Sequence, residues 1–181
     1  MIKFFIEPGY EVKSPERAWG NAGIDFYVPN HSDAFVKAFN EKNMMFAPLT
    51  SLTVNETGEK VIRIEPTGRV NIPSGVRGRI DSGVMLVAQN KSGVATKLGL
   101  VCGATLVDPN YKGMIHLSLI NTSNKTVDIP LGMKITQFVP ASYETSKVET
   151  VDGNSGTSVE EFYKDFEFDN RGEGAFGSTG V

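Results

Sequence analysis

The sequence predicts an all-β fold built as one domain. Its apolar segments are short, and glycine and proline turns separate them at close intervals. The segment from Met114 to Ile120 alternates apolar and polar residues, as expected of a strand with one buried face. The 181 residues suit a single domain, and an apolar fraction of 40% is ample for one core. Short strands joined by many turns are typical of a sandwich or a barrel.

The expected strands of the first half of the chain are rich in aromatic or β-branched residues. They are Ile2–Ile6, Ile24–Val28, Ser51–Val54, Val61–Glu65, Arg69–Ile72, Val76–Ile80 and Val84–Ala88. Asn55-Glu56-Thr57-Gly58 is predicted to close a hairpin, and Pro73-Ser74-Gly75 to turn the chain between two strands.

Residues 32–43 predict a short helix instead. Ser32 suits the N-cap, Asp33 the first turn, and Phe35 and Phe39 fall on one helical face.

In the second half, strands are expected at Met114–Ile120, Thr126–Ile129, around Ile135–Val139 and at Val148–Val151. Residues 121–125 are expected to turn the chain so that Thr126–Ile129 pairs back on the strand before it. Residues 152–157 have the composition of a flexible linker. A capping box formed by Ser158 and Glu161 then predicts a short helix, and the last ten residues are rich in glycine.

Composition and charge exclude several classes of protein. A net charge of −3 without a basic block gives no support to general nucleic-acid binding. Cys102 is the single cysteine, so no internal disulfide can form and a reducing compartment is expected. The N-terminus lacks the pattern of a signal peptide, and no apolar run approaches the length of a membrane span. These features predict a cytoplasmic protein without membrane contact, in the host cytoplasm if the source is a virus.

The stretch from Lys91 to Gly113 concentrates the residues that could carry chemistry. Lys91-Ser92-Gly93 is a set suited to phosphate, and Asp108 and Tyr111 flank a Pro-Asn turn. A hairpin here would hold Asp108 and Tyr111 together and expose backbone groups to a flat polar ligand. Taken alone, Asp108 is more often a turn carboxylate that caps its own backbone, and Tyr111 a strand aromatic.

Five short segments, in order, resemble the motifs of the trimeric deoxyuridine triphosphatases (dUTPases). They are Ala22–Phe26, Lys91–Gly93, the segment from Leu98 to Gly113, Gly132–Gln137 and Arg171–Gly180. One such motif is weak, whereas five in the expected order across the chain are a strong signal.

The resemblance implies roles for the third segment. Asp108 would orient and deprotonate the water that attacks the α-phosphorus, the task of a general base. Tyr111 would lie under the deoxyribose, where a 2′-hydroxyl would clash. The backbone of Thr105, Leu106 and Val107, with the stretch around His116, would bind uracil.

The remaining segments would hold the phosphates. Lys91, Ser92, Gly93 and Gln137 match phosphate-contacting positions, with lysine in place of arginine at Lys91 and again at Lys134. In the tail, Arg171 would clamp a terminal phosphate, Phe176 would stack on the base, and Gly177 and Ser178 would donate hydrogen bonds.

Asp25 has a structural and a functional interpretation. A half-buried strand aspartate is often structural, whereas the resemblance places Asp25 near Mg²⁺ and the sugar, partly through water. No His/Asp cluster has the spacing of a metal site, and Mg²⁺ takes most of its ligands from water and phosphates.

The resemblance implies a β jelly roll (β-clip) in a homotrimer. Residues 1–151 would form the core, with an insertion at about 31–68, and residues 152–181 a linker and arm that closes a neighbour's site. The reaction would be hydrolysis of dUTP to dUMP and pyrophosphate with Mg²⁺, which keeps uracil out of DNA and supplies dUMP for thymidylate synthesis. Two alternatives stay open, a dCTP deaminase of the same fold and a jelly-roll binding or regulatory protein.

Overall fold

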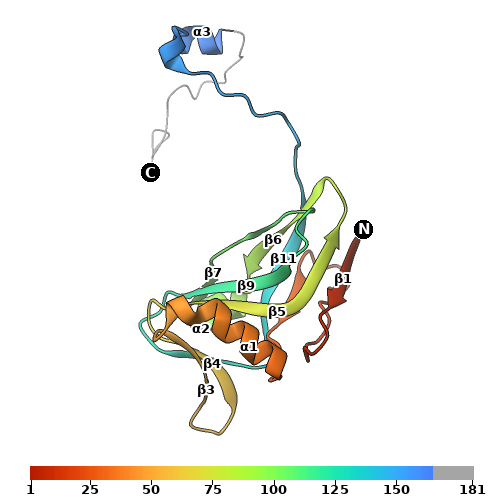
Figure 1. Ribbon diagram of the computed structural model, residues 1–181, viewed down its shortest axis with the longest axis vertical. Helices are drawn as coiled ribbons and strands as arrows, with labels where there is room; N and C mark the ends of the chain where they lie inside the picture. Colours follow the sequence, from red (N-terminus) through yellow and green to blue (C-terminus); the bar gives the residue numbers. More distant parts are fainter. Residues whose placement is uncertain (165–181) are drawn as a thin grey trace. The chain divides into compact units, whose positions relative to one another are not determined.

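The structure, a computed structural model, describes residues 1–164 (Figure 1). The chain divides into two units, Met1–Glu144 and Thr145–Val181. The first unit contains three sheets, with strand orders β1-β5-β9-β7, β10-β4-β3 and β2-β11-β6-β8. The strands are β1 (Ile2–Ile6), β2 (Ile24–Tyr27), β3 (Thr50–Val54), β4 (Lys60–Ile64), β5 (Arg69–Ile80), β6 (Val84–Asn90), β7 (Leu100–Cys102), β8 (Leu106–Val107), β9 (Met114–Asn121), β10 (Val127–Pro130) and β11 (Lys134–Ser142).

The core lies between the sheets and is formed by the inward residues of each strand. In β9, Ile115, Leu117 and Leu119 are buried while their neighbours are half-buried, which confirms the predicted alternation. Phe26 of β2 is fully buried and packs edge-to-face against Phe4 and Phe138, at centroid distances of 5.4 Å and 4.8 Å. This antiparallel arrangement confirms the predicted all-β jelly roll.

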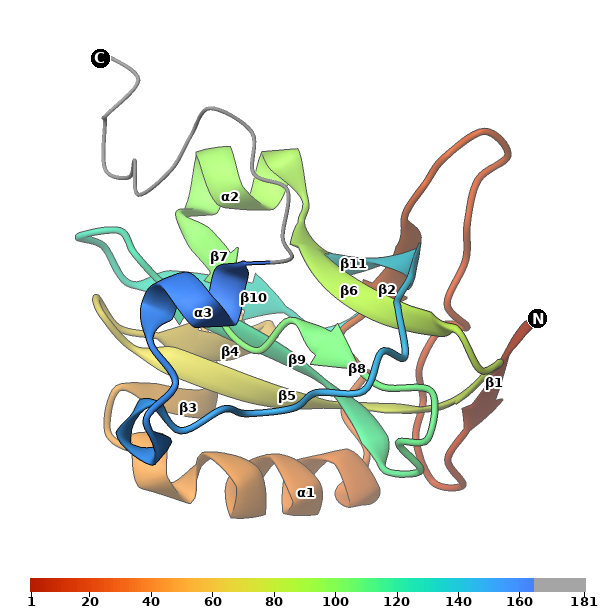
Figure 2. The ribbon, with the colours of Figure 1, turned by 90° about the horizontal axis from the view of Figure 1, so that it is seen from above.

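The predicted helix forms as α1 (Asp33–Asn43), with the Ser32 hydroxyl accepting from the Phe35 N–H at 3.3 Å. It runs alongside β5 in both ribbon views (Figures 1 and 2). Its last residue, the buried Asn43, accepts from the Asn71 N–H at 2.8 Å and donates to the Asn71 carbonyl at 3.1 Å. Asn43 therefore takes the place of a neighbouring strand along the part of β5 that β1 does not cover.

The turn predicted at Pro73-Ser74-Gly75 is wrong, because β5 is one continuous strand from Arg69 to Ile80. The three residues form an irregularity at which the pairing register with β9 shifts. Gly75 takes a φ of +72°, which suits glycine, and the Ser74 hydroxyl donates to the Ile115 carbonyl at 2.6 Å. The turn residues thus kink a strand rather than end it.

The predicted hairpin around Asp108 and Tyr111 is also wrong in its pairing. The turn exists, since the Tyr111 N–H donates to the Asp108 carbonyl at 3.1 Å. The strands on its two sides, β8 and β9, belong to different sheets, so this turn crosses from one layer to the other. A helix that was not predicted, α2 (Ser92–Leu98), ends at Gly99 with φ +68°.

Two predictions for the later strands need correction. The strand expected at Val148–Val151 does not form, and β11 is the last strand of the described residues. The strand after the 121–125 turn forms as β10, but it pairs with β4 of the hairpin within residues 31–68.

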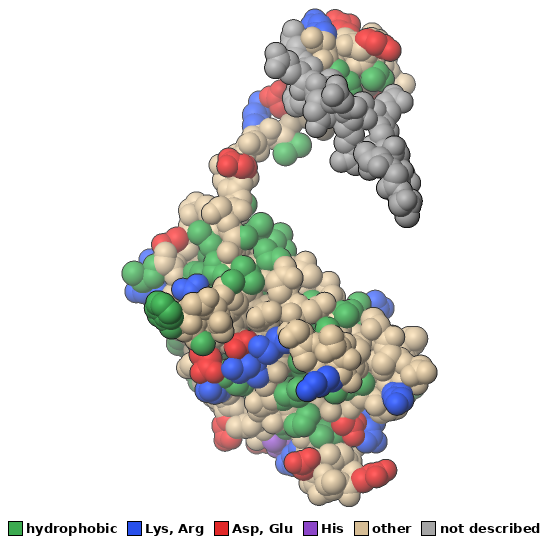
Figure 3. Space-filling view, turned by 180° about the vertical axis from the view of Figure 1, so that it is seen from behind, with side chains coloured by type: hydrophobic (Ala, Val, Ile, Leu, Met, Phe, Trp, Pro, Cys, Tyr) green, Lys and Arg blue, Asp and Glu red, His purple; other side chains and the backbone are tan. Residues whose placement is uncertain are grey.

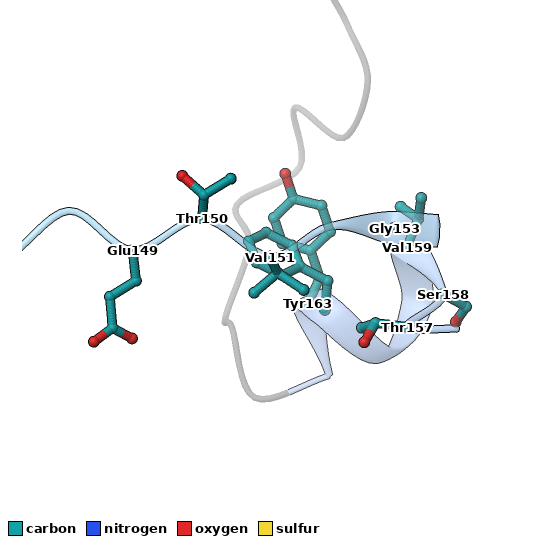
Figure 4. A pocket seen from close by; sticks show the side chains of 9 residues that line it. Glu149, Thr150, Val151, Gly153, Thr157, Ser158, Val159 and Tyr163 are labelled. Carbon is teal, nitrogen blue, oxygen red and sulfur yellow. The ribbon is translucent and has the colours of Figure 1, made fainter. Parts of the chain in front are cut away.

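The second unit contains η2 (Gly153–Ser155) and α3 (Val159–Tyr163). The Ser158 hydroxyl caps α3 by accepting from the Glu161 N–H at 3.1 Å, as the sequence predicts. A hollow in this unit lies between residues 149–153 and 157–163. Figure 4 shows the residues that line it, among them Glu149, Val151 and Tyr163. Of the predicted site residues within residues 1–164, none lines this hollow.

The surface drawn in Figure 3 carries acidic and basic side chains next to each other, with apolar side chains between them. Within residues 1–164 no helix has the length and apolar character needed to cross a membrane.

Candidate functional site

Lys91 and Gln137 lie where two shallow hollows adjoin. One hollow is lined by Lys91, Ser92, Gly93 and Gln137 with neighbours from α2, and the other by Gly23, Asp25, Asn90, Lys91 and Gln137. The structure therefore brings together residues from the first, second and fourth motif-like segments.

Strand pairing produces this cluster. Lys91 follows directly after β6, and both β6 and β2 pair with β11, which carries Gln137. The Gln137 Nε2 donates to the Asn90 carbonyl at 3.0 Å. A Cβ at Gly23 would lie 2.4 Å from the Gln137 Oε1, so glycine is required there for the amide to lie over the loop.

Asp25 lies between two lysines. Its Oδ1 is 2.5 Å from the Lys91 Nζ, and its Oδ2 is 2.9 Å from the Lys134 Nζ. Burial opposes ionisation of Asp25, but the two ammonium groups outweigh it and hold its pKa below the ordinary value. Asp25 is thus an ionised carboxylate that fixes two cations near the hollows.

Two residues outside the predicted site join this cluster. Lys134 also approaches the Glu16 Oε1 at 3.2 Å, and the Tyr27 hydroxyl donates to the same carboxylate. No motif marks Glu16, and a lone glutamate at position 16 gives sequence reasoning no signal.

Asp108 lies at the opposite end of the same sheet, just after β8. It lines a polar cleft with Ser82, Asn110 and Tyr143. The Asp108 carbonyl accepts the turn hydrogen bond, but its side chain has no hydrogen-bond or ion-pair partner within residues 1–164. The carboxylate is therefore not a backbone cap and is free to accept from a water or a ligand.

Tyr111 follows Asn110 in the same turn, does not itself line the cleft, and has 43% of its surface exposed. Its hydroxyl donates to the Met114 carbonyl at 2.9 Å, which holds the ring at the start of β9. A ring that is fixed and exposed offers a flat apolar surface to a sugar or a base.

β8 is the outermost strand of its sheet. The Thr105 carbonyl accepts from the Ala88 N–H at 2.7 Å, and Val107 pairs with Leu86. Because hydrogen-bonding groups alternate sides along a strand, the N–H and C=O of Leu106 point to the open edge. Among residues 1–164 no strand covers that edge, so Leu106 offers one donor and one acceptor to a flat polar ligand.

His116 lies in β9, on a different sheet from Thr105–Val107. It is half-buried, and burial together with the nearby Lys42 ammonium lowers its pKa. A neutral imidazole at neutral pH follows, and the structure shows no carboxylate or nucleophile bonded to it in the described part of the chain.

The structure does not bring Asp108 to the Lys91 cluster. The β6–β8 register puts Val107 opposite Leu86, so Asp108 lies beside Met85, near one end of β6. Lys91 follows the other end of β6, six residues beyond Met85. At a rise of ~3.3 Å per residue this separates the two by about 20 Å. Arg171, Phe176, Gly177 and Ser178 lie outside the described residues.

Comparisons with known proteins agree on one family. The family model described as dUTPase matches residues 59–180. The deoxyuridine 5′-triphosphate nucleotidohydrolase of Yarrowia lipolytica is 30% identical over 118 residues, which are 61% of this chain and 69% of the relative.

Solved structures with the same fold include two phage enzymes. A variant of the Staphylococcus bacteriophage 80alpha dUTPase with dUpNHpp covers 100% of this chain and 99% of its own, with 18% identity and a TM-score of 0.68. A variant of the dUTPase from phage phi11 of S. aureus covers 84% and 97%, with 17% identity and a TM-score of 0.60. With a dUTPase model matching residues 59–180, the five segments in order and this fold, the chain belongs to the dUTPase family and is a dUTP diphosphatase, which hydrolyses dUTP.

Proposed function

We propose that this chain cleaves dUTP between the α- and β-phosphates, with a water activated by Asp108 attacking the α-phosphorus. The free Asp108 carboxylate in a polar cleft carries this proposal. A carboxylate within hydrogen-bond reach of a water can orient it and accept its proton as the new bond to phosphorus forms. Pyrophosphate then leaves, and dUMP is the second product.

The outer phosphates would bind at Lys91, Ser92, Gly93 and Gln137. Lys91 and Gln137 line both hollows there, and Lys91 retains donors for a phosphate while it contacts Asp25. The first internal hydrogen bonds of α2 run from Val94 and Ala95 to the Lys91 carbonyl. The N–H groups of Ser92 and Gly93 precede them and can donate to phosphate oxygens.

One substrate cannot reach both ends of the site within a single chain. About 20 Å along β6 separates Asp108 from Lys91, whereas the α- and γ-phosphates of one triphosphate are near neighbours. We therefore assign Asp108 and the Lys91 cluster of each active site to two different copies of the chain. A cyclic homotrimer, which the resemblance implies, supplies three such sites.

The base and sugar would bind at the Asp108 end. The open edge of β8 at Leu106 would hydrogen-bond uracil with backbone groups, while Thr105 and Val107 hold the strand to β6. Tyr111 would cover the deoxyribose and reject a 2′-hydroxyl. His116, half-buried in another sheet, would contribute through the nearby backbone rather than through proton transfer.

Mg²⁺ suits this donor set as an ion held by the substrate. Within residues 1–164 no group of three His, Cys, Asp or Glu side chains could hold a metal. Each Asp25 carboxylate oxygen accepts from one lysine and can still accept from a water that is bound to the ion. Bound Mg²⁺ would neutralise phosphate charge, and the phi11 enzyme coordinates a structural Mg(II) ion.

The tail would complete the site. Arg171 would clamp the terminal phosphate, Phe176 would stack on uracil, and Gly177 and Ser178 would donate to phosphate oxygens. Residues 152–170 would give this arm the length to reach a neighbouring copy, with residues 1–151 as the trimer's core and 31–68 as an insertion. In the cell, the reaction would keep uracil out of DNA and supply dUMP for thymidylate synthesis.

The direct test replaces Asp108 by Asn and separates binding from turnover. The amide keeps the shape but cannot take a proton, so binding of a non-hydrolysable dUTP analogue should stay near wild type. Pyrophosphate release should fall at least ~100-fold. Assays with dUTP, dCTP, dTTP and UTP in parallel check the substrate. Wild-type turnover by Asp108→Asn would remove Asp108 from the mechanism.

A further inference from the structure

Glu16 lies outside the five motif-like segments, yet it contacts the phosphate side of the site. Its backbone bridges to β2: the Asp25 N–H donates to the Glu16 carbonyl at 2.7 Å, and the Glu16 N–H donates to the Asp25 carbonyl at 3.2 Å. Its side chain then reaches Lys134 at 3.2 Å through Oε1 and Lys13 at 3.0 Å through Oε2. Two backbone hydrogen bonds thus hold the main chain of Glu16 beside Asp25.

Tyr27 fixes the carboxylate end of Glu16. Tyr27 is buried, and its hydroxyl donates to the Glu16 Oε1 while it accepts from the Lys13 Nζ at 2.9 Å. The Lys134 Nζ lies 5.5 Å from the Tyr27 ring centroid. The Tyr27 hydroxyl, Lys13 and Lys134 lower the pKa of Glu16 to about 2, so Glu16 is anionic at neutral pH.

A chain of ion pairs connects Glu16 to the two hollows. Glu16 contacts Lys134, Lys134 contacts the Asp25 Oδ2, and the Asp25 Oδ1 contacts Lys91. Neither Glu16 nor Lys134 lines the two hollows that Lys91 and Gln137 share. The contacts by which the Glu16 side chain can orient Lys91 therefore run through Lys134 and Asp25.

We propose that Glu16 is a positioning residue for dUTP hydrolysis: it fixes Lys134, which orients the Asp25 carboxylate so that Lys91 presents its ammonium to the triphosphate. This role depends on the proposed binding of the outer phosphates at Lys91. It adds to the site a residue from the segment before β2 that the motifs do not contain.

The direction in which KM for dUTP changes when Glu16 loses its charge distinguishes a positioning role from a simple charge effect. An anion near the site repels a triphosphate, so removal of a mere counter-charge should improve substrate binding and lower KM. Removal of a residue that orients Lys134 and Asp25 should do the reverse, because Lys91 then loses its fixed direction.

The experiment compares Glu16→Gln with Glu11→Gln in steady-state dUTP hydrolysis by the full chain. Both variants remove one negative charge from the same segment, and the exposed Glu11 side chain has no polar contact within residues 1–164. Glu16→Gln should raise KM for dUTP about tenfold, the lower end of what is lost when the partner that orients a metal ligand is removed. The value of kcat should stay within about twofold. Glu11→Gln should leave both unchanged. An unchanged or lower KM in Glu16→Gln overturns the proposal.

A double-mutant cycle tests the route of the effect. If Glu16 acts through Lys134, Glu16→Gln should not change KM further in a Lys134→Met background. Independent, multiplying effects overturn the proposal. Tyr27→Phe keeps the ring, removes only the hydroxyl that holds Glu16, and should raise KM in the same direction; it replaces Glu16→Gln if that variant fails to fold.

Lys91→Met separates this proposal from the one on which it depends. If Lys91→Met leaves KM unchanged, the assignment of the phosphates to Lys91 fails. If Lys91→Met raises KM and Glu16→Gln does not, the positioning role of Glu16 alone fails.

Discussion

Replacing Asn43 by Ala should show how α1 protects the edge of β5. The Asn43 side chain makes three hydrogen bonds: with the Asn71 N–H at 2.8 Å, the Asn71 carbonyl at 3.1 Å and the Phe39 carbonyl at 2.8 Å. A net contribution of about 1 kcal/mol per hydrogen bond predicts a loss of roughly 3 kcal/mol. Asn71 is only half-buried, so water can replace part of this, and a loss of about 2 kcal/mol is the expected value.

The matched control is Asn40→Ala in the same helix. Asn40 is exposed and its side chain has no hydrogen bond within residues 1–164. Asn40→Ala gains the helix propensity of alanine, up to ~0.7 kcal/mol, whereas Asn43 lies at the helix end with φ −110° and gains less. The control shows what an alanine substitution does in α1 when no side-chain hydrogen bond is lost. Urea unfolding measures the difference between the two variants and is done at one fixed protein concentration, because the proposed trimer would make stability concentration-dependent. Equal unfolding midpoints for the two variants would refute the account of this edge.

Asp128→Asn should lower stability by less than about 1 kcal/mol at neutral pH, because it breaks a partly exposed bidentate pair with Arg63. Arg63 lowers the pKa of Asp128 in the folded protein. The stabilisation is therefore present above the unfolded pKa of ~3.9 and is lost as the pH falls through the folded pKa. Thermal melts of the wild type and Asp128→Asn should differ at pH 7 and converge in acid. Tyr111→Ala should narrow the ratio of kcat/KM for dUTP over UTP, and an unchanged ratio would place sugar discrimination elsewhere. Deletion of residues 171–181 should leave the assembly intact by light scattering but nearly abolish turnover, and full activity would exclude the tail from the site.

Much of the fold follows from local patterns. The alternation in β9 predicts its buried face, and Ser32 and Ser158 predict the start of two helices, because both signals act within one element. The strand expected at Val148–Val151 lacks a partner strand in the described residues, and apolar residues alone do not form a strand without one.

Other features depend on contacts that the sequence does not display. Pro73, Ser74 and Gly75 have the composition of a turn, but the Ser74 hydroxyl bonds to β9 and keeps β5 continuous. The helix α2 contains Gly93 and β-branched residues of low helix propensity, so it depends on its surroundings rather than on its own sequence.

The candidate site likewise combines residues that the sequence predicts with contacts that it does not display. The motif-like segments predict the residues of both ends, Asp108 and Lys91 among them, but the register of β6 and β8 decides that the two lie far apart in one chain. Glu16 enters the cluster through its backbone bridge to Asp25 and through Tyr27, and neither contact has a sequence signal.

The most direct test of a site shared between copies is complementation in mixed assemblies. One inactive variant carries Asp108→Asn and the other carries Lys91→Met with Gln137→Ala; the two are unfolded together in equal amounts and refolded. If each site takes Asp108 from one copy and Lys91 with Gln137 from the next, random mixing in a cyclic trimer leaves about a quarter of the sites intact. The account predicts dUTP hydrolysis near a quarter of the wild-type rate. If one chain supplies both ends, every chain in the mixture carries a defect, and activity no higher than that of the separate variants would contradict the shared site.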